Sequence, residues 1–127
     1  MPLKNMSDWE WRYKMAEKIC TRLDFEKFGV KGFYIFGSTK NATAGPASDI
    51  DILIHFRGDQ KQKECLLIWM DGWSQALAEI NEQKIGYESD GLLDVHLITD
   101  EDIKNKTSFA VKINAITDAA RPLKVID

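Results

Sequence analysis

Several residue types that support common classes of function are scarce in this chain. Among its 127 residues are two cysteines, two histidines and three prolines. Neither Cys-x-x-Cys nor His-Glu-x-x-His spacing occurs, which argues against a structural zinc site. Cys20 and Cys65 both lie in helical patterns, so we expect buried free thiols rather than a disulfide. A chain of this length can bury enough apolar surface to fold without such cross-links.

The sequence also lacks an excess of positive charge and any long apolar run. Seventeen Lys and Arg residues against 20 Asp and Glu residues give a net charge of −3, which argues against a broad nucleic-acid interface. No run reaches the ~18 apolar residues of a membrane-spanning helix. The charged N-terminal stretch has no apolar segment typical of a secretory signal. We therefore expect a cytoplasmic protein that has no membrane partner.

Helix and strand patterns alternate along the chain and predict a single domain over residues 1–127. The order α-β-β-α-β-α favours an α/β (α+β) fold, in which a small mixed β-sheet is flanked by helices. Trp11 lies off the apolar stripe of the first helix, so we expect it to be exposed and to mark a partner or dimer surface. Apolar periodicity, capping residues and β-branched or aromatic runs predict helices over 8–27, 61–84 and 107–119 and strands over 32–36, 49–56 and 91–98.

Two short polar motifs stand where the first two predicted strands end and begin. Gly37-Ser38 follows the first strand, and Asp49-Ile50-Asp51 opens the second. Alternate residues of a strand share a face, so the two carboxylates should project together, roughly 6.5 Å apart along the strand. Carboxylates this close favour a cation between them, and Mg²⁺ suits a site completed by phosphates and water. The Gly-Ser turn would let backbone N–H groups and a hydroxyl approach a phosphate.

A third acid and three basic side chains extend this pattern. Asp94 lies within an otherwise apolar strand, and it would reach the same site if that strand pairs beside the second one. Two-metal sites hold their ions about 3.5–4 Å apart, and such a third carboxylate would bind the second ion. Lys40 follows the Gly-Ser turn within reach of a phosphate, although a solvated lysine is the commoner role. His55 and His96 share strand faces with the acids, and each either supports them or is satisfied locally.

Taken together, Gly37-Ser38, ten intervening residues, Asp49-Ile50-Asp51 and a later Asp94 resemble the DNA polymerase β-type nucleotidyltransferase superfamily. The closest likeness is to its minimal (MNT-type) domains, and it covers about residues 30–98. The resemblance implies a polymerase β-like core that transfers a nucleoside monophosphate, AMP from ATP first of all, to a hydroxyl-type acceptor. It also implies that Gly37 and Ser38 contact the triphosphate. Asp49, Asp51 and Asp94 would then form the catalytic and metal-binding triad for two Mg²⁺ ions.

Other interpretations of these residues remain open at the level of the sequence. An Asp-x-Asp pair also occurs in turns and solvated strand edges, whereas a haloacid dehalogenase-type site would need a buried strand before the first acid. The alternative function is a non-catalytic nucleotide-binding or antitoxin-like regulatory module that acts with a partner protein or as a homodimer. For an enzyme, the acidic balance favours a protein or small-molecule acceptor over nucleic acid. The sequence does not identify the acceptor or the nucleotide.

Overall fold

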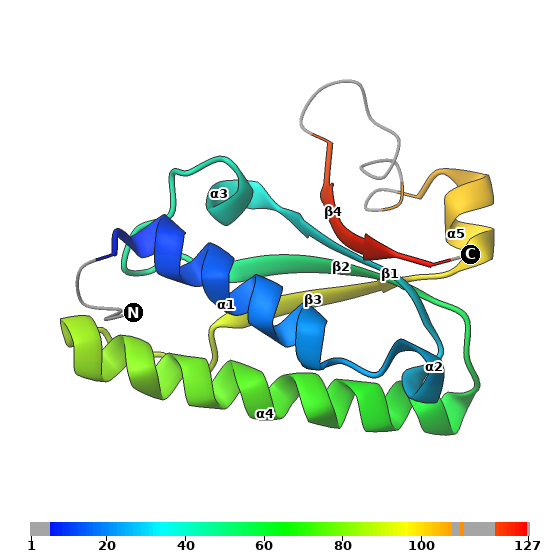
Figure 1. The fold of residues 1–127 in the computed structure, drawn as a ribbon, viewed down its shortest axis with the longest axis horizontal. Coiled ribbons are helices and arrows are strands. Elements are labelled where there is room, and N and C mark those ends of the chain that lie inside the picture. Colours follow the sequence, from blue (N-terminus) through cyan, green and yellow to red (C-terminus); the bar gives the residue numbers. More distant parts are fainter. Residues whose placement is uncertain (1–5, 108–109, 111–118, 127) are drawn as a thin grey trace.

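The computed structural model describes residues 6–107, 110 and 119–126. A single sheet with strand order β3-β2-β1-β4 forms one layer, and the two long helices, α1 and α4, lie together on one side of it (Figure 1). The predicted α/β class with a small mixed sheet is confirmed. In chain order the elements are α1 (Asp8–Arg22), α2 (Phe25–Phe28), β1 (Val30–Phe36), α3 (Gly37–Lys40), β2 (Ile50–Phe56), α4 (Gln60–Ile85), β3 (Leu93–Ile98), α5 (Asp100–Asn105) and β4 (Arg121–Val125).

The segment predicted as one first helix forms two. The backbone N–H and the hydroxyl of Ser7 donate to the Glu10 carboxylate at 3.3 and 2.6 Å, as the capping-box spacing predicts. The helix ends at Arg22, earlier than predicted, because the Asp24 side chain accepts a hydrogen bond from the Lys27 backbone N–H and starts α2. A residue that favours the cap position over the helix interior therefore divides the segment.

The helix predicted over 61–84 is confirmed, and a short additional helix, α5, follows β3. α4 begins after Asp59, whose side chain caps it, and ends at Gly86 in the left-handed conformation. α5 begins after Thr99, whose hydroxyl accepts a bond from the Asp102 N–H at 3.1 Å. The helix predicted over 107–119 falls largely outside the described residues. Among the helices that the structure describes, none combines the length and apolarity needed to cross a membrane.

The pairing of the strands decides which side chains share a face of the sheet. β1 and β2 are antiparallel, whereas β2 and β3 are parallel. Ile50, Ile52 and Ile54 are fully buried in the core cluster that also contains residues of α1 and α4. Because side chains alternate along a strand, Asp51 projects from the opposite face of the sheet. That face carries a second, smaller apolar cluster made of Tyr34, Phe36, Leu53, Ile98, Ala110 and Ala120.

The structure contains a strand that the sequence did not predict. β4 pairs antiparallel with β1 at one edge of the sheet. Four of its five residues are exposed, so it shows no alternation of apolar and polar residues. Pro122 also argues against a strand, but an edge strand tolerates proline because one side of its backbone has no ladder bonds to make. The position of β4 at the edge of the sheet therefore explains why it contains a proline and why its sequence shows no strand pattern.

Two predictions about individual side chains were wrong. Cys20 is buried as expected, but Cys65 is exposed. Trp11 is fully buried rather than exposed, so it does not mark a surface for a partner or a second copy. α1 contacts α3 as well as the sheet, which gives the helix a second covered side. A single apolar stripe in the sequence does not reveal this second neighbour.

Candidate active site

The Gly37-Ser38 turn and the Asp51 carboxylate lie against each other. Phe36, the last residue of β1, pairs with Asp51 in the antiparallel ladder, and Gly37 follows with φ of 72°. A Cβ atom at this glycine would collide with Asp51 Oδ2. Both the left-handed backbone and the close approach of the carboxylate therefore require glycine. The turn and the acid, 14 positions apart in the sequence, occupy one place in the fold.

Asp51 and Asp94 stand side by side on parallel strands. β2 and β3 pair in a register that sets Asp51 directly opposite Asp94. The Asp94 side chain is 50% exposed, and Asp51 is partly buried. Burial is the main cause that raises the pKa of Asp51 to about 6, followed by the charges of Asp94 and Asp49 and a hydrogen bond with Asp94. Burial and the nearby charge of Asp94 thus both disfavour the ionised form of Asp51.

Asp49 joins these two acids from outside the sheet. β2 begins at Ile50, so Asp49 is the last residue of the connecting loop rather than the first of the strand. Partial burial and the charge of Asp94 raise the pKa of Asp49, while Arg12 lowers it. The three predicted carboxylates therefore lie close enough to affect one another, although they come from a loop and two strands.

The donor set at this place suits a hard divalent cation. Its side-chain ligands would be carboxylate oxygens, which Mg²⁺ prefers. Burial first, and then the charges of Asp94 and Asp49, raise the pKa of Asp51, and a cation would offset both effects. In the part of the chain that the structure describes, no group of three or more acidic, histidine or cysteine side chains is arranged so that it could hold a metal ion by itself. Mg²⁺ needs no such group, because substrate phosphates and water supply most of its ligands. These residues fit the ion as members of an open site.

The acids lie at the surface of the protein: Asp49 and Asp94 are exposed, and Asp51 is partly buried. A hollow of about 330 Å³ lies instead between α1 and β4, where it is lined by residues that include Cys20 and Lys124. Pocket shape alone would therefore direct attention to a different part of the molecule. A site for a large, highly charged ligand is defined by charge and backbone donors rather than by an apolar cavity.

Two further residues of the predicted phosphate site have partners within the protein. The Ser38 carbonyl accepts a bond from the Thr43 N–H at 2.9 Å, which holds the turn at the start of α3. Lys40 Nζ donates to the Ala119 carbonyl at 2.7 Å, and so points toward the segment before β4. The role of Lys40 in phosphate binding stays a prediction, because a nucleotide would have to compete for its amine.

The two histidines belong to different clusters. His96 Nε2 lies 3.1 Å from Asp94 Oδ2, and its ring lies 6.0 Å from that of Phe36. His55 Nε2 lies 2.7 Å from Asp100 Oδ1, near the other end of β2. His96 is therefore beside the candidate site, whereas His55 is satisfied elsewhere. Strand alternation placed both histidines on the face of the acids but gave no basis for choosing between them.

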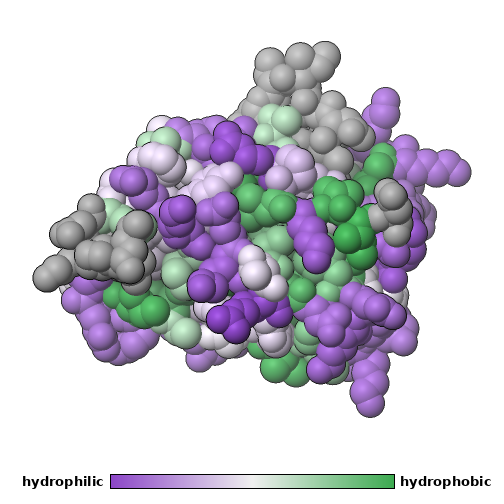
Figure 2. Space-filling model, in the orientation of Figure 1, coloured by the Kyte–Doolittle hydropathy of each residue, from purple (hydrophilic) through white to green (hydrophobic). Residues whose placement is uncertain are grey.

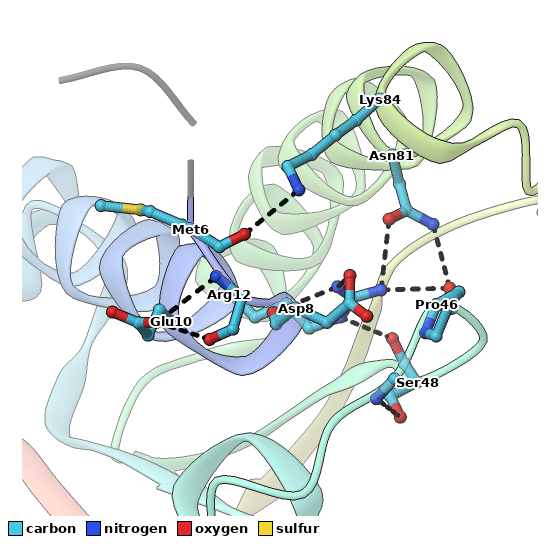
Figure 3. Close-up of polar contacts among 10 residues, drawn as sticks. Met6, Asp8, Glu10, Arg12, Pro46, Ser48, Asn81 and Lys84 are labelled. Carbon is cyan, nitrogen blue, oxygen red and sulfur yellow. Dashed lines mark hydrogen bonds and ion pairs between the residues drawn. The ribbon is translucent and has the colours of Figure 1, made fainter. Parts of the chain in front are cut away.

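Sequence reasoning missed Arg12, which is fully buried behind the loop that ends at Asp49. Its guanidinium donates to the carbonyls of Asp8, Pro46 and Ser48 and to the side-chain oxygen of Asn81 (Figure 3). Burial lowers the pKa of Arg12, while Asp8 and Asp49 raise it. The only available signal was an arginine near the apolar stripe of a helix, which more often reaches solvent.

Comparison with known proteins shows the family of the chain. A sequence model of the nucleotidyltransferase domain family matches residues 13–121, which include both motifs and Asp94. Among solved structures, the chain is similar to a candidate nucleotidyltransferase from Sulfolobus solfataricus, at 19% identity and a TM-score of 0.43, over 80% of this chain and 78% of that one. None of the curated proteins matches the chain. Because the family match spans most of its length, this chain belongs to the nucleotidyltransferase domain family.

Proposed function

We propose that this domain transfers a nucleoside monophosphate, AMP from ATP in the first instance, to a hydroxyl-type acceptor in a Mg²⁺-dependent reaction. In this proposal, Asp49, Asp51 and Asp94 hold the metal ions. The backbone and hydroxyl of Gly37-Ser38 receive the triphosphate, with Lys40 as an additional phosphate contact. Protein or small-molecule acceptors remain favoured over nucleic acid, because the chain carries more acidic than basic residues.

One observation supports this proposal above the others. Asp51 stands opposite Asp94 in the parallel ladder while its carboxylate touches the turn at Gly37. A site for metal-bound triphosphate needs acids for the metal next to backbone groups that tolerate phosphate, and these two requirements meet at Asp51. A structural ion pair would instead place a basic side chain against the acid. The raised pKa of Asp51 is opposite to the effect of such a pair.

The proposed reaction assigns a separate task to each part of the site. The acceptor oxygen bonds to the α-phosphorus, the bond to the β-phosphate oxygen breaks, and pyrophosphate leaves with that electron pair. Asp94 takes the acceptor's proton on the oxygen that His96 does not contact. Bound metal ions would neutralise the phosphate charge. The remaining contribution of the protein is to hold donor and acceptor in line, which is positioning and electrostatic stabilisation.

Calorimetric titration with the four nucleoside triphosphates, with and without Mg²⁺, tests the proposal first. We expect Mg²⁺-dependent binding by the wild type, strongest with ATP, and its loss in Asp51→Asn. Asp100→Asn is the matched control, because Asp100 is an acid near the opposite end of β2 that pairs with His55 and Arg57. Its substitution should leave nucleotide binding unchanged. A folded wild type that binds none of the four nucleotides would overturn the proposal.

The alternative is a nucleotide-binding module that acts with a partner protein and does not turn over substrate. α4 presents Leu67 and Ile68 to solvent, at 39% and 73% exposure, and Figure 2 shows hydrophobic residues interrupting the polar surface along the α4 edge. Exposed apolar residues of this kind are common at partner surfaces. Both functions require nucleotide binding, but only the transferase releases pyrophosphate. Pyrophosphate release in the presence of candidate acceptors therefore separates them.

A further inference from the structure

Arg12 connects three parts of the chain that are distant in the sequence. It lies on α1 and is fully buried. Its Nε donates to the Ser48 carbonyl at 3.0 Å, and Nη2 donates to the Pro46 carbonyl at 3.2 Å and to Asn81 Oδ1 at 3.3 Å (Figure 3). Lysine offers only one donor group, so it could not reproduce this set of bonds.

Asn81 completes the same arrangement from α4. It is fully buried, and its side-chain Nδ2 donates to the Pro46 carbonyl at 3.1 Å. The Pro46 carbonyl therefore accepts from both Arg12 and Asn81. A buried amide and a buried guanidinium on two helices thus converge on one stretch of loop. Exposed loops seldom receive this much buried polar support, because desolvating such groups is costly unless their hydrogen bonds are satisfied.

These bonds reach the backbone immediately before Asp49. The Ser48 carbonyl and the Asp49 N–H belong to one planar peptide, so fixing the carbonyl also fixes the direction of that peptide. On the other side of Asp49, the Ile50 N–H donates to the Leu92 carbonyl at 2.7 Å. Asp49 is therefore held between a peptide bound by Arg12 and a peptide bound by the segment that precedes β3. Asp49 lies outside β2, so the alternation of side chains along the strand does not by itself fix the direction of its carboxylate.

We propose that Arg12 is a positioning residue, which together with Asn81 holds the loop before β2 so that Asp49 is preorganised beside Asp51 and Asp94. Arg12 itself touches neither substrate nor metal in this proposal. The inference rests on the proposed function, because it assigns Asp49 to the metal site. Under this inference, the buried Arg12 of α1 contributes to the affinity of the site for Mg²⁺ and nucleotide.

Hydrogen exchange tests the effect on the loop in Arg12→Lys, Arg12→Met and Asn81→Ala. The reporters are the N–H groups of Ser48, bonded to the Gly45 carbonyl at 3.0 Å, and of Gly45, bonded to Ser48 Oγ at 2.9 Å. We expect both to exchange at least about tenfold faster in each variant. The control is Ile19→Ala, which opens a cavity at a fully buried position of the same helix. It should lower Tm without selectively accelerating exchange in the loop.

Calorimetry with ATP, with and without Mg²⁺, then tests the effect on the site at a temperature where every variant is folded. We expect the Mg²⁺-dependent affinity to fall about 10- to 100-fold in Arg12→Met, with Arg12→Lys recovering only part of the loss. Ile19→Ala should bind as the wild type does. Unchanged loop exchange, or affinities no lower than that of Ile19→Ala, would overturn the inference.

The two proposals fail in different ways. A wild type that binds no nucleotide with Mg²⁺ overturns the proposed function, and with it the role of Arg12 at a metal site, even if the loop exchanges faster in the variants. A wild type that binds, together with Arg12 variants that bind equally well, overturns only the inference about Arg12. If Arg12→Met does not fold, Arg12→Lys and Asn81→Ala carry the same comparison.

Discussion

The two ends of β2 carry charged clusters of opposite character. Near its start, Asp51 is partly buried among other acids, and its pKa is raised to about 6. Near its end, His55 and Arg57 both contact Asp100, with Arg57 Nε 2.8 Å from Asp100 Oδ2. Hydrogen bonds from Arg57 and His55 lower the pKa of Asp100 to about 2. The acids near the start of β2 therefore lack a partner as strong as the two that Asp100 has near the end of the strand.

This difference separates a structural cluster from a candidate functional one. Asp100 has the partners that an acid in a folded protein normally acquires, and nothing about it calls for a ligand. The acids near the start of β2 repel one another at a place where the Asp51 carboxylate packs closely against Gly37. Folding alone gives no reason to bring such groups together. Proteins do so where a ligand or reaction supplies the missing charge.

The largest expected effect comes from removing an acid at one end of β2 rather than the other. Asp94→Asn should reduce nucleotidyl transfer by about 10²–10³-fold, because it removes a side chain proposed both as a metal ligand and as the proton acceptor. Asp100→Asn should leave transfer within about twofold of the wild type. Pyrophosphate release under saturating Mg²⁺ and ATP, with an acceptor on which the wild type is active, measures both. Equal losses in the two variants would show that the comparison between the ends is wrong.

A pair of glycine substitutions sharpens the comparison next. Gly37→Ala forces a left-handed alanine against Asp51, and we expect it to cost ~2 kcal/mol of folding stability and to weaken nucleotide binding. Gly72 lies in α4, and a Cβ there would meet open space. Gly72→Ala should therefore stabilise the protein by roughly 0.5–1 kcal/mol. Urea denaturation followed by circular dichroism measures the change in the free energy of unfolding for both variants. A Gly37→Ala protein more stable than the wild type would contradict the close approach of Asp51 to Gly37.

Stability against pH provides a third test. The pKa of Asp51 is raised from 3.8 to about 6, so the folded state keeps this proton to higher pH than the unfolded chain does. The Asp51 contribution therefore makes stability fall as pH rises through this window, and ionised Asp51 destabilises the fold above it. Asp51→Asn should be more stable than the wild type at pH 7 by ~1–2 kcal/mol, after allowance for solvent screening.

Denaturation at several pH values, with and without Mg²⁺, measures this effect. The Asp100 contribution has the opposite sign, because its pKa is lowered. It is present at neutral pH and is lost as pH falls through about 2. Asp100→Asn should therefore not gain stability at pH 7. A loss of stability in Asp51→Asn at pH 7 would contradict the assignment of unbalanced charge to the start of the strand.

The smallest expected effect comes from the two histidines. His96→Gln should lower transfer about fivefold, which is ~1 kcal/mol, because Asp94 loses a partner that orients its carboxylate. His55→Gln should leave transfer unchanged, since His55 contacts Asp100. Steady-state rates at saturating nucleotide distinguish the two variants. Equal activity of both would mean that His96 does not orient Asp94 in the reaction.

Much of the candidate site could be predicted from local sequence. Gly37 had to follow a strand, and Asp51 had to point away from the apolar residues around it, because strand alternation has a fixed period of two. The capping-box spacing of Ser7 and Glu10 likewise marked a helix start, since a cap acts within about one turn. These features depend on neighbours a few positions away, which a single sequence contains.

The sequence by itself determined the acids, the glycine turn and the helices that frame them. Only the tertiary structure decided that Asp94 stands opposite Asp51, that His96 and not His55 lies beside the acids, and that Arg12 is buried behind the loop of Asp49. Register between strands, the second covered side of α1 and the partner of each charge arise from residues far apart in the chain. Local periodicity carries no information about those distances, whereas packing around one core fixes them.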